Sequence, residues 1–187
     1  MPQLEKKLIK YILDRDDDDY KIFVETGTYR GDTIISMESL FDELHTIEIL
    51  EDLYNLCKNK IKNKKINFYL GDSSTILKDI CIKLKNNAIF FLDGHYSGNG
   101  TGRGDKDCPL YEELQSIMNN FKHNSIVIID DCRDFGKKHV SGNGKIIDWS
   151  KINLSNILEI TQKRRTEYYF LPSSICEDDR IVLKLSK

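Results

Sequence analysis

Short apolar runs alternate with longer segments of helical periodicity along most of the chain. The runs have the length of buried strands, and the segments between them repeat apolar positions every three to four residues, as amphipathic helices do. Strands are therefore expected at 22–25, 44–47, 66–70, 88–92 and 126–129. Helices are expected at 3–14, 32–41, 51–61, 73–84 and 109–121.

This alternation predicts repeated right-handed crossovers, and hence a parallel sheet with helices on both faces. The C-terminal part has a different pattern, because an expected helix at 150–160 is followed by two strand-like runs, 167–171 and 180–185. The polar turn between those runs indicates an antiparallel pair. We predict a three-layer, doubly wound α/β fold with a mostly parallel sheet that ends in this pair.

The length of 187 residues suits one hydrophobic core, so residues 1–187 are expected to form a single domain, with an N-terminal helix and an acidic turn in 1–20. A net charge of -2 argues against a nucleic-acid partner. The five scattered cysteines, the absence of a signal-like start and the lack of a long apolar run predict a cytoplasmic protein, in the host if it is viral, with no membrane partner. The sequence leaves open whether the chain forms a homo-oligomer.

The first expected strand leads into the loop Glu25-Thr-Gly-Thr-Tyr-Arg-Gly-Asp-Thr33. Gly27 and Gly31 allow a sharp turn and a close approach to a ligand at the start of the next helix. A dinucleotide site would prefer Gly-x-Gly-x-x-Gly, whereas this loop has Gly-x-x-x-Gly after an acid. Glu25 would repel a pyrophosphate but suits a ligand with an amino group and a sulfonium. A plain glycine turn is the alternative.

Acidic residues also end the next two expected strands. Glu48 follows Glu25 by 23 positions, where a carboxylate suits the two hydroxyls of a ribose. Asp72 is placed to accept from an adenine amino group, and Ser73 to offer its backbone N–H. Each acid alone would serve equally as a helix cap. Together, the three strand ends indicate a nucleoside pocket.

These segments resemble the successive cofactor motifs of class I S-adenosylmethionine-dependent methyltransferases, and the resemblance spans about residues 21 to 185. It implies a Rossmann-like methyltransferase fold, with seven strands of which the last is antiparallel, and S-adenosylmethionine as cofactor. It further implies that Gly27 lies beside the amino-acid part, Glu48 at the ribose and Asp72 at the adenine. The expected cofactor contacts are Glu25, Thr26, Gly27, Thr28, Tyr29, Gly31, Asp32, Thr33, Glu48, Asp72, Ser73 and Asp93.

The fourth expected strand ends in Asp93-Gly-His95, and the fifth ends in Asp130-Asp131. Acids gathered at one sheet edge need a cation or hydrogen-bond donors, and hard oxygen ligands suit magnesium. Methyl transfer to a hydroxyl also needs a base, and a histidine with a pKa of about 6.5 can accept that proton. The alternatives are that the acids bind backbone N–H groups and that His95 is hydrogen-bonded into its loop.

This second cluster resembles the metal-dependent O-methyltransferases that modify sugar hydroxyls in antibiotic biosynthesis. The resemblance implies a metal held by Asp93, Asp130 and Asp131, with Asp93 and His95 as catalytic residues. His95 stands where that family has a basic aspartate. A nearer resemblance is to bacterial and viral proteins with Asp-Gly-His-Tyr-Ser-Gly, a glycine-rich stretch and then Lys-Asp-x-Pro, here Lys106-Asp-Cys-Pro109.

The glycine-rich loop 97–107 follows the catalytic strand directly, so we predict a substrate lid, with a mobile surface loop as the alternative. A second mobile region, 133–144, is placed to close the other side, while Trp149 is expected to pack a helix onto the sheet rather than stack on a sugar. The residues expected to contact the acceptor are Tyr96, Arg103, Lys106 and Asp107.

The sequence thus predicts a methyltransferase that uses S-adenosylmethionine and magnesium to methylate a small-molecule hydroxyl on a sugar or nucleotide sugar. A phenolic or other small acceptor is the alternative within that class. A cofactor-binding module without turnover, and an oxidoreductase that uses a dinucleotide, are the alternatives outside it.

Overall fold

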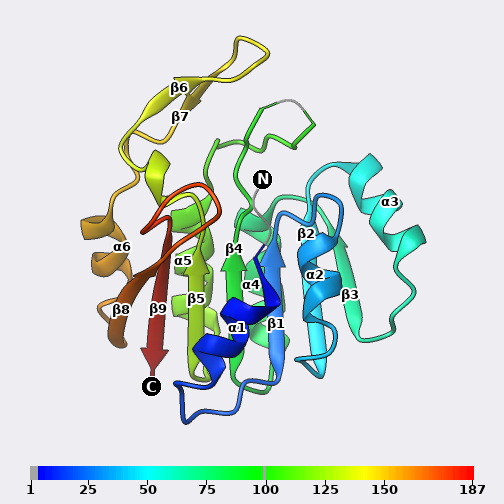
Figure 1. Ribbon diagram of the computed structural model, residues 1–187, viewed down its shortest axis with the longest axis vertical. Helices are drawn as coiled ribbons and strands as arrows, with labels where there is room; N and C mark the ends of the chain where they lie inside the picture. Colours follow the sequence, from blue (N-terminus) through cyan, green and yellow to red (C-terminus); the bar gives the residue numbers. More distant parts are fainter. Residues whose placement is uncertain (1–3, 99) are drawn as a thin grey trace.

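The computed structural model describes residues 4–98 and 100–187, and its centre is a seven-stranded sheet in the order β3-β2-β1-β4-β5-β9-β8 (Figure 1). The first five strands run parallel, and β9 pairs antiparallel with both β5 and β8. This is the predicted α/β fold with its antiparallel end. The strands of this sheet are β1 (Ile22–Thr26), β2 (Glu43–Glu48), β3 (Ile66–Leu70), β4 (Ala88–Leu92), β5 (Ser125–Ile129), β8 (Arg165–Leu171) and β9 (Arg180–Ser186).

Two hydrophobic cores lie on opposite faces of the sheet, and each is covered by three helices. Alternation along β1 builds both cores, since Ile22 and Val24 belong to one and Phe23 to the other. On the Phe23 face lie α1 (Lys6–Leu13), α2 (Asp32–Met37) and α3 (Glu51–Lys60). On the other face lie α4 (Ser73–Lys83), α5 (Leu110–Asn120) and α6 (Leu154–Thr161).

The helix boundaries differ in places from those expected. The helix expected at 32–41 ends at Met37, and the one expected at 150–160 begins at Leu154, where the Asn153 side chain accepts a hydrogen bond from the backbone of Asn156 at 2.9 Å. The expected start of the first helix at residue 3 lies outside the described residues. Among the described residues, no helix combines the length and the apolar character needed to cross a membrane.

A small hairpin, formed by β6 (Lys138–Val140) and β7 (Ile146–Asp148), projects beyond the sheet (Figure 1). It lies largely within the region expected to be mobile. Five of its six strand residues are exposed and only Ile147 is buried, so these strands lack the buried apolar run of the strands in the main sheet. The hairpin and the glycine-rich loop after β4 stand at the same end of the sheet, beyond the carboxyl ends of the parallel strands.

Candidate functional site

A hollow that is open to solvent lies where β1, β2, β3 and β4 end. This is the edge at which ligands bind in open α/β sheets. Most of its polar lining comes from the loops that follow these strands. The lining includes the predicted residues Gly27, Tyr29, Glu48, Asp72, Ser73, Asp93, His95 and Lys106.

The loop after β1 is held close to the loop after β4. Gly27 has a φ of +81°, and a Cβ atom on it would lie 2.3 Å from the carbonyl oxygen of Asp93, so only glycine fits there. The Thr26 hydroxyl accepts a hydrogen bond from the backbone N–H of Asp93 at 3.1 Å. The ends of the two central strands are therefore fixed to each other at the centre of the site.

Glu48 connects the ends of β1 and β2. Its carboxylate accepts hydrogen bonds from the backbone N–H groups of Tyr29 at 2.8 Å and Leu50 at 2.9 Å. Burial raises the pKa of Glu48, against the opposing effect of these backbone donors. Each carboxylate oxygen keeps a second lone pair, so Glu48 can still accept from the hydroxyls of a ligand in the hollow.

Glu25 does not line the hollow, although the sequence suggested a direct ligand contact. Its side chain is buried below the loop, where the Thr46 hydroxyl donates to it at 2.6 Å. Burial raises the pKa of Glu25 well above its ordinary value, and the nearby charges of Asp93 and Glu48 add to that effect. The other predicted cofactor contacts absent from the lining are Thr26, Thr28, Gly31, Asp32 and Thr33.

Asp72 caps α4 and also lines the hollow. One carboxylate oxygen accepts from the backbone N–H of Ser74 at 2.9 Å. The glycine-rich loop packs over the other side, since a Cβ atom on Gly104 would lie 2.2 Å from Asp72 Oδ2 and one on Gly102 would lie 1.9 Å from Ile49 Cγ2. The loop therefore covers the part of the hollow expected to hold a nucleoside.

The charge of the hollow favours a ligand without phosphate groups. Glu48, Asp72 and Asp93 line it, and the only lysine or arginine among the described lining residues is Lys106, which pairs with Glu112. A pyrophosphate requires cations or a glycine-rich row of N–H groups. These carboxylate acceptors instead fit a nucleoside linked to an amino acid, as in S-adenosylmethionine.

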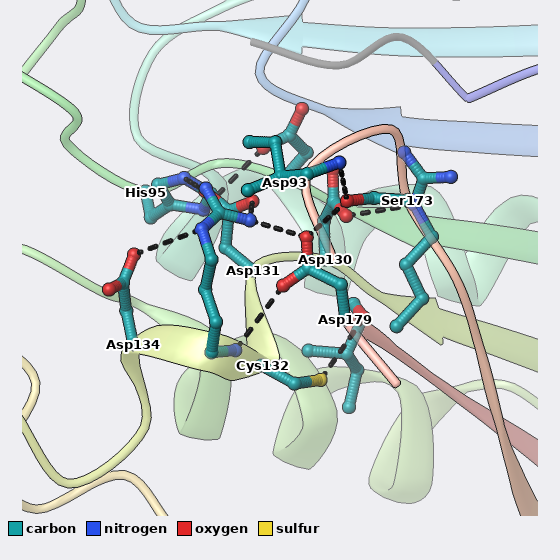
Figure 2. A network of polar contacts seen from close by, with 12 residues as sticks. Asp93, His95, Asp130, Asp131, Cys132, Asp134, Ser173 and Asp179 are labelled. Carbon is teal, nitrogen blue, oxygen red and sulfur yellow. Dashed lines mark hydrogen bonds and ion pairs between the residues drawn. The ribbon is translucent and has the colours of Figure 1, made fainter. Parts of the chain in front are cut away.

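His95 lies at the inner end of the hollow between two acids. Its Nε2 is 2.9 Å from Asp131 Oδ2, and its Nδ1 is 3.5 Å from Asp93 Oδ1 (Figure 2). Burial alone would lower the pKa of His95, but Asp131, Asp93 and Asp130 together raise it to about 9. The same contact, with help from Arg133, lowers the pKa of Asp131 to about 2 against the effect of burial. His95 is therefore an imidazolium near neutral pH.

Cations of the chain itself neutralise the carboxylates at which magnesium was expected. Oxygens of Asp130, Asp131 and Asp179 lie within 4.8 Å of one another, a spacing that would suit a metal ion. However, Arg180 Nε donates to Asp130 at 2.8 Å, and Arg133 Nη1 donates both to Asp131 at 2.6 Å and to Asp179. Figure 2 shows the network around these acids.

Both oxygens of Asp131 already face a cation of the chain, since Arg133 binds Oδ1 and His95 faces Oδ2. Asp93 is not in the group with metal-ligand spacing among the described residues. Since guanidinium groups already neutralise the acids, the predicted set Asp93, Asp130 and Asp131 does not fit a magnesium ion in this arrangement.

The residues predicted to contact the acceptor mostly join the glycine-rich loop to the hairpin. The Tyr96 hydroxyl accepts from Asn143 at 3.1 Å, and the Asp107 carboxylate accepts from the backbone N–H of Asp148 at 2.9 Å. Arg103 lies over the Tyr96 ring at 5.1 Å and pairs with Asp107 at 2.6 Å. Lys106 alone among the four lines the hollow.

Four residues of the site were not singled out from the sequence: Glu113, Arg133, Asp179 and Arg180. A signal for Arg180 was present, because an arginine that opens an apolar strand needs a buried acid as partner. Glu113 lies on the inner face of α5, as its helical spacing from Leu110, Leu114 and Ile117 indicates. A carboxylate on an apolar helix face is a signal in the sequence that lies outside the strand-end motifs.

No protein-family model matches the chain, and no curated protein matches it. Solved structures do: the S-adenosylmethionine-bound amino pentose methyltransferase CalS10 of Micromonospora echinaspora has a TM-score of 0.62 at 8% identity, over 96% of this chain and 89% of its own. An rRNA methylase of Streptococcus thermophilus has a TM-score of 0.59 at 13% identity, and the match covers 100% of this chain and 99% of that protein. A methyltransferase of Clostridium acetobutylicum has a TM-score of 0.60 at 11% identity, and the match covers 96% of this chain and 89% of that protein. This chain therefore has the Rossmann-like fold of S-adenosylmethionine-dependent methyltransferases.

Proposed function

We propose that the chain is an S-adenosylmethionine-dependent methyltransferase that methylates a hydroxyl group of a small molecule, with sugars as the first acceptor class. One observation carries the proposal: the acids that end β2, β3 and β4 converge on one hollow, and His95 stands at its inner end. In this proposal Glu48 binds the ribose hydroxyls, Asp72 faces the adenine, and the Gly27 loop and Asp93 adjoin the amino-acid part.

Bound S-adenosylmethionine supplies an electrophilic methyl group on a sulfonium sulfur. His95 takes the proton of the acceptor hydroxyl as the oxygen receives the methyl group, leaving S-adenosylhomocysteine, a methyl ether and an imidazolium. Asp131 holds Nε2 of His95, so Nδ1, which faces Asp93, is the nitrogen that accepts the proton. Because the pKa of His95 is about 9, the neutral base is a minority form at pH 7.

The proposal has no step that depends on a metal ion. Arg180 and Arg133 already neutralise Asp130, Asp131 and Asp179. Magnesium was expected from the sequence because these clustered acids need a cation. Phenols remain the second acceptor class, because a phenol loses its proton near pH 10 and would need less help from His95.

Cofactor binding and turnover test the proposal separately. Isothermal titration should detect binding of S-adenosylhomocysteine, and Glu48→Ala should weaken it, because that variant loses the ribose contact and frees the Tyr29 and Leu50 amides. Exposed Glu159→Gln is the control. Incubation with methyl-labelled S-adenosylmethionine and a panel of sugars and phenols should give a labelled product. If the protein bound NAD but did not bind S-adenosylhomocysteine, the proposed function would be wrong and an oxidoreductase would take its place.

A further inference from the structure

A buried carboxyl group of α5 lies against the turn that joins Asp93 to His95. Glu113 is only 2% exposed and stands on the apolar face of that helix. A Cβ atom on Gly94, the middle residue of the turn, would lie 2.9 Å from Glu113 Oε1, which leaves no room for a side chain. The backbone of the turn therefore packs directly on the carboxyl group.

Two hydroxyl groups meet at the same point. The Cβ atom built on Gly94 would lie 3.0 Å from both Thr26 Oγ1 and Ser73 Oγ. Thr26 ends β1 and Ser73 begins α4, so three separate elements bring buried oxygens beneath the turn. Ser73 and Gly94 also line the cofactor hollow, whereas Glu113 does not.

The Thr26 hydroxyl connects Glu113 to Asp93. Its oxygen accepts from the backbone N–H of Asp93 at 3.1 Å, so its single hydrogen is left to donate elsewhere. Burial raises the pKa of Glu113 to about 7, and hydrogen bonds from the Ser73 and Thr26 hydroxyls oppose that rise. With its hydrogen directed at Glu113, the Thr26 hydroxyl presents its lone pair to Asp93.

The carboxyl group of Glu113 does more than fill space. Burial raises its pKa, which means that the folded state holds the charged form less favourably than water does. An apolar side chain of the same length would occupy the position without that cost. The polar contacts with Thr26 and Ser73 are therefore what the carboxyl group contributes.

We propose that Glu113 is a positioning residue for methyl transfer. It accepts hydrogen bonds from Thr26 and Ser73, and through Thr26 it holds the turn from Asp93 to His95 where His95 reaches the acceptor hydroxyl. This role rests on the function proposed above, in which His95 takes the proton. Glu113 itself neither binds the cofactor nor takes that proton.

Hydrogen exchange followed by NMR tests this link without an acceptor. Glu113→Met removes both oxygens at nearly the same length, whereas Glu113→Gln removes the charge but keeps an oxygen that accepts from a hydroxyl. The Asp93 amide should exchange about tenfold faster in Glu113→Met, and within about threefold of the wild-type rate in Glu113→Gln. The Asp130 amide, which donates to the Leu92 carbonyl at 3.2 Å, is the internal reference and should not change.

Two results would overturn the proposal. Equal Asp93 exchange rates in Glu113→Met and Glu113→Gln would show that its hydrogen bonds do not hold the turn. Parallel changes at Asp93 and Asp130 would show a general loss of stability instead. Thr26→Val adds a check, because Glu113→Met should not speed Asp93 exchange further once the connecting hydroxyl is gone. Additive effects of these two substitutions would likewise contradict the link.

Turnover should follow the same order. With the panel acceptor that gives labelled product, Glu113→Met should lower kcat about ten- to a hundredfold, and Glu113→Gln should recover most of the rate. The dissociation constant for S-adenosylhomocysteine should stay within about threefold of the wild type in both variants, because Glu113 does not line the cofactor hollow. Exposed Glu159→Met is the matched control.

The failure of this inference is distinct from the failure of the proposed function. If kcat is unchanged in Glu113→Met, the positioning role is wrong even where S-adenosylhomocysteine binds. If S-adenosylhomocysteine does not bind the wild type, the proposed function is wrong instead. The Asp93 exchange rates then still decide whether Glu113 holds the turn.

Discussion

Asp131 Oδ2 lies 2.9 Å from Nε2 of His95, and Asp131 reaches this position from a left-handed backbone conformation with a φ of +59°. Aspartate tolerates that conformation better than most residues, yet it still costs free energy. The turn after β5 thus carries strain that aims one carboxylate of the Asp130–Asp131 pair at His95 and leaves the other for Arg180.

The pH dependence of turnover should reflect this pair. Because the pKa of His95 is about 9 and the base must be neutral, kcat/KM should rise with pH and level off above about pH 9. Asp131→Asn removes the charge that raises this pKa, so the rising limb should move to lower pH by about one unit or more. His95→Ala should lower kcat by about 10² to 10⁴. A flat profile between pH 6 and 9 would contradict the role of His95.

Chelation should leave the activity unchanged. Arg133 and Arg180 neutralise the acidic cluster, so a protein dialysed against EDTA should transfer methyl groups at the wild-type rate. Manganese binding, followed by electron paramagnetic resonance, should be absent in the wild type. It should appear in an Arg133→Ala, Arg180→Ala double variant if the variant folds, since Asp130, Asp131 and Asp179 then lose their guanidinium partners. Loss of activity on chelation, restored by magnesium, would revive the metal site expected from the sequence.

Gly102 is expected to control how the glycine-rich loop covers the cofactor hollow. A Cβ atom there would lie 1.9 Å from Ile49 Cγ2, so Gly102→Ala should lift the loop and speed the dissociation of S-adenosylhomocysteine. Gly142→Ala is the matched control, because a Cβ atom at Gly142 meets nothing within 4 Å. Stopped-flow measurement of the dissociation rate compares them, and equal rates in both variants would show that the loop does not retain the ligand.

Glu113 should make the stability of the protein depend on pH. Burial raises its pKa to about 7 in the folded state, from an ordinary value of 4.5. The unfolded chain releases this proton at lower pH, so Glu113 reduces the free energy of unfolding progressively from about pH 4.5 to 7, by as much as about 3 kcal/mol. Glu113→Gln should therefore be more stable than the wild type at pH 8 and similar at pH 4.5, by denaturant titration. Exposed Glu159→Gln should show no such difference.

The strands of the sheet were predictable because each one corresponds to a short run of apolar residues in the sequence. Each parallel strand is a run of buried apolar residues, and the residues that end it face one edge whatever the details of packing. The hairpin at 138–148 was missed because its strands are short and exposed, and it is held by contacts with Tyr96 and Asp107, far away in the sequence.

The strand-end motifs could not predict which groups neutralise the acids of the site. These motifs predicted that Asp93, His95, Asp130 and Asp131 lie together. Arg180, however, opens the antiparallel strand β9 near the other end of the chain, and Asp179 immediately precedes it. A cluster of acids in a sequence looks the same whether a metal ion or an arginine will neutralise it. Only the pairing of β9 with β5 distinguishes the two.

The contacts between the glycine-rich loop and the β6–β7 hairpin have a consequence for the order of events. The loop covers the nucleoside end of the cofactor hollow, while the hairpin leads into Trp149, whose backbone N–H donates to Lys137 at 2.8 Å. Hydrogen bonds from Asn143 to Tyr96 and from Asp148 to Asp107 join the hairpin to the glycine-rich loop. Movement of one of these two segments therefore disturbs the other. Steady-state kinetics should then be ordered, with the methyl donor entering first and its demethylated product leaving last.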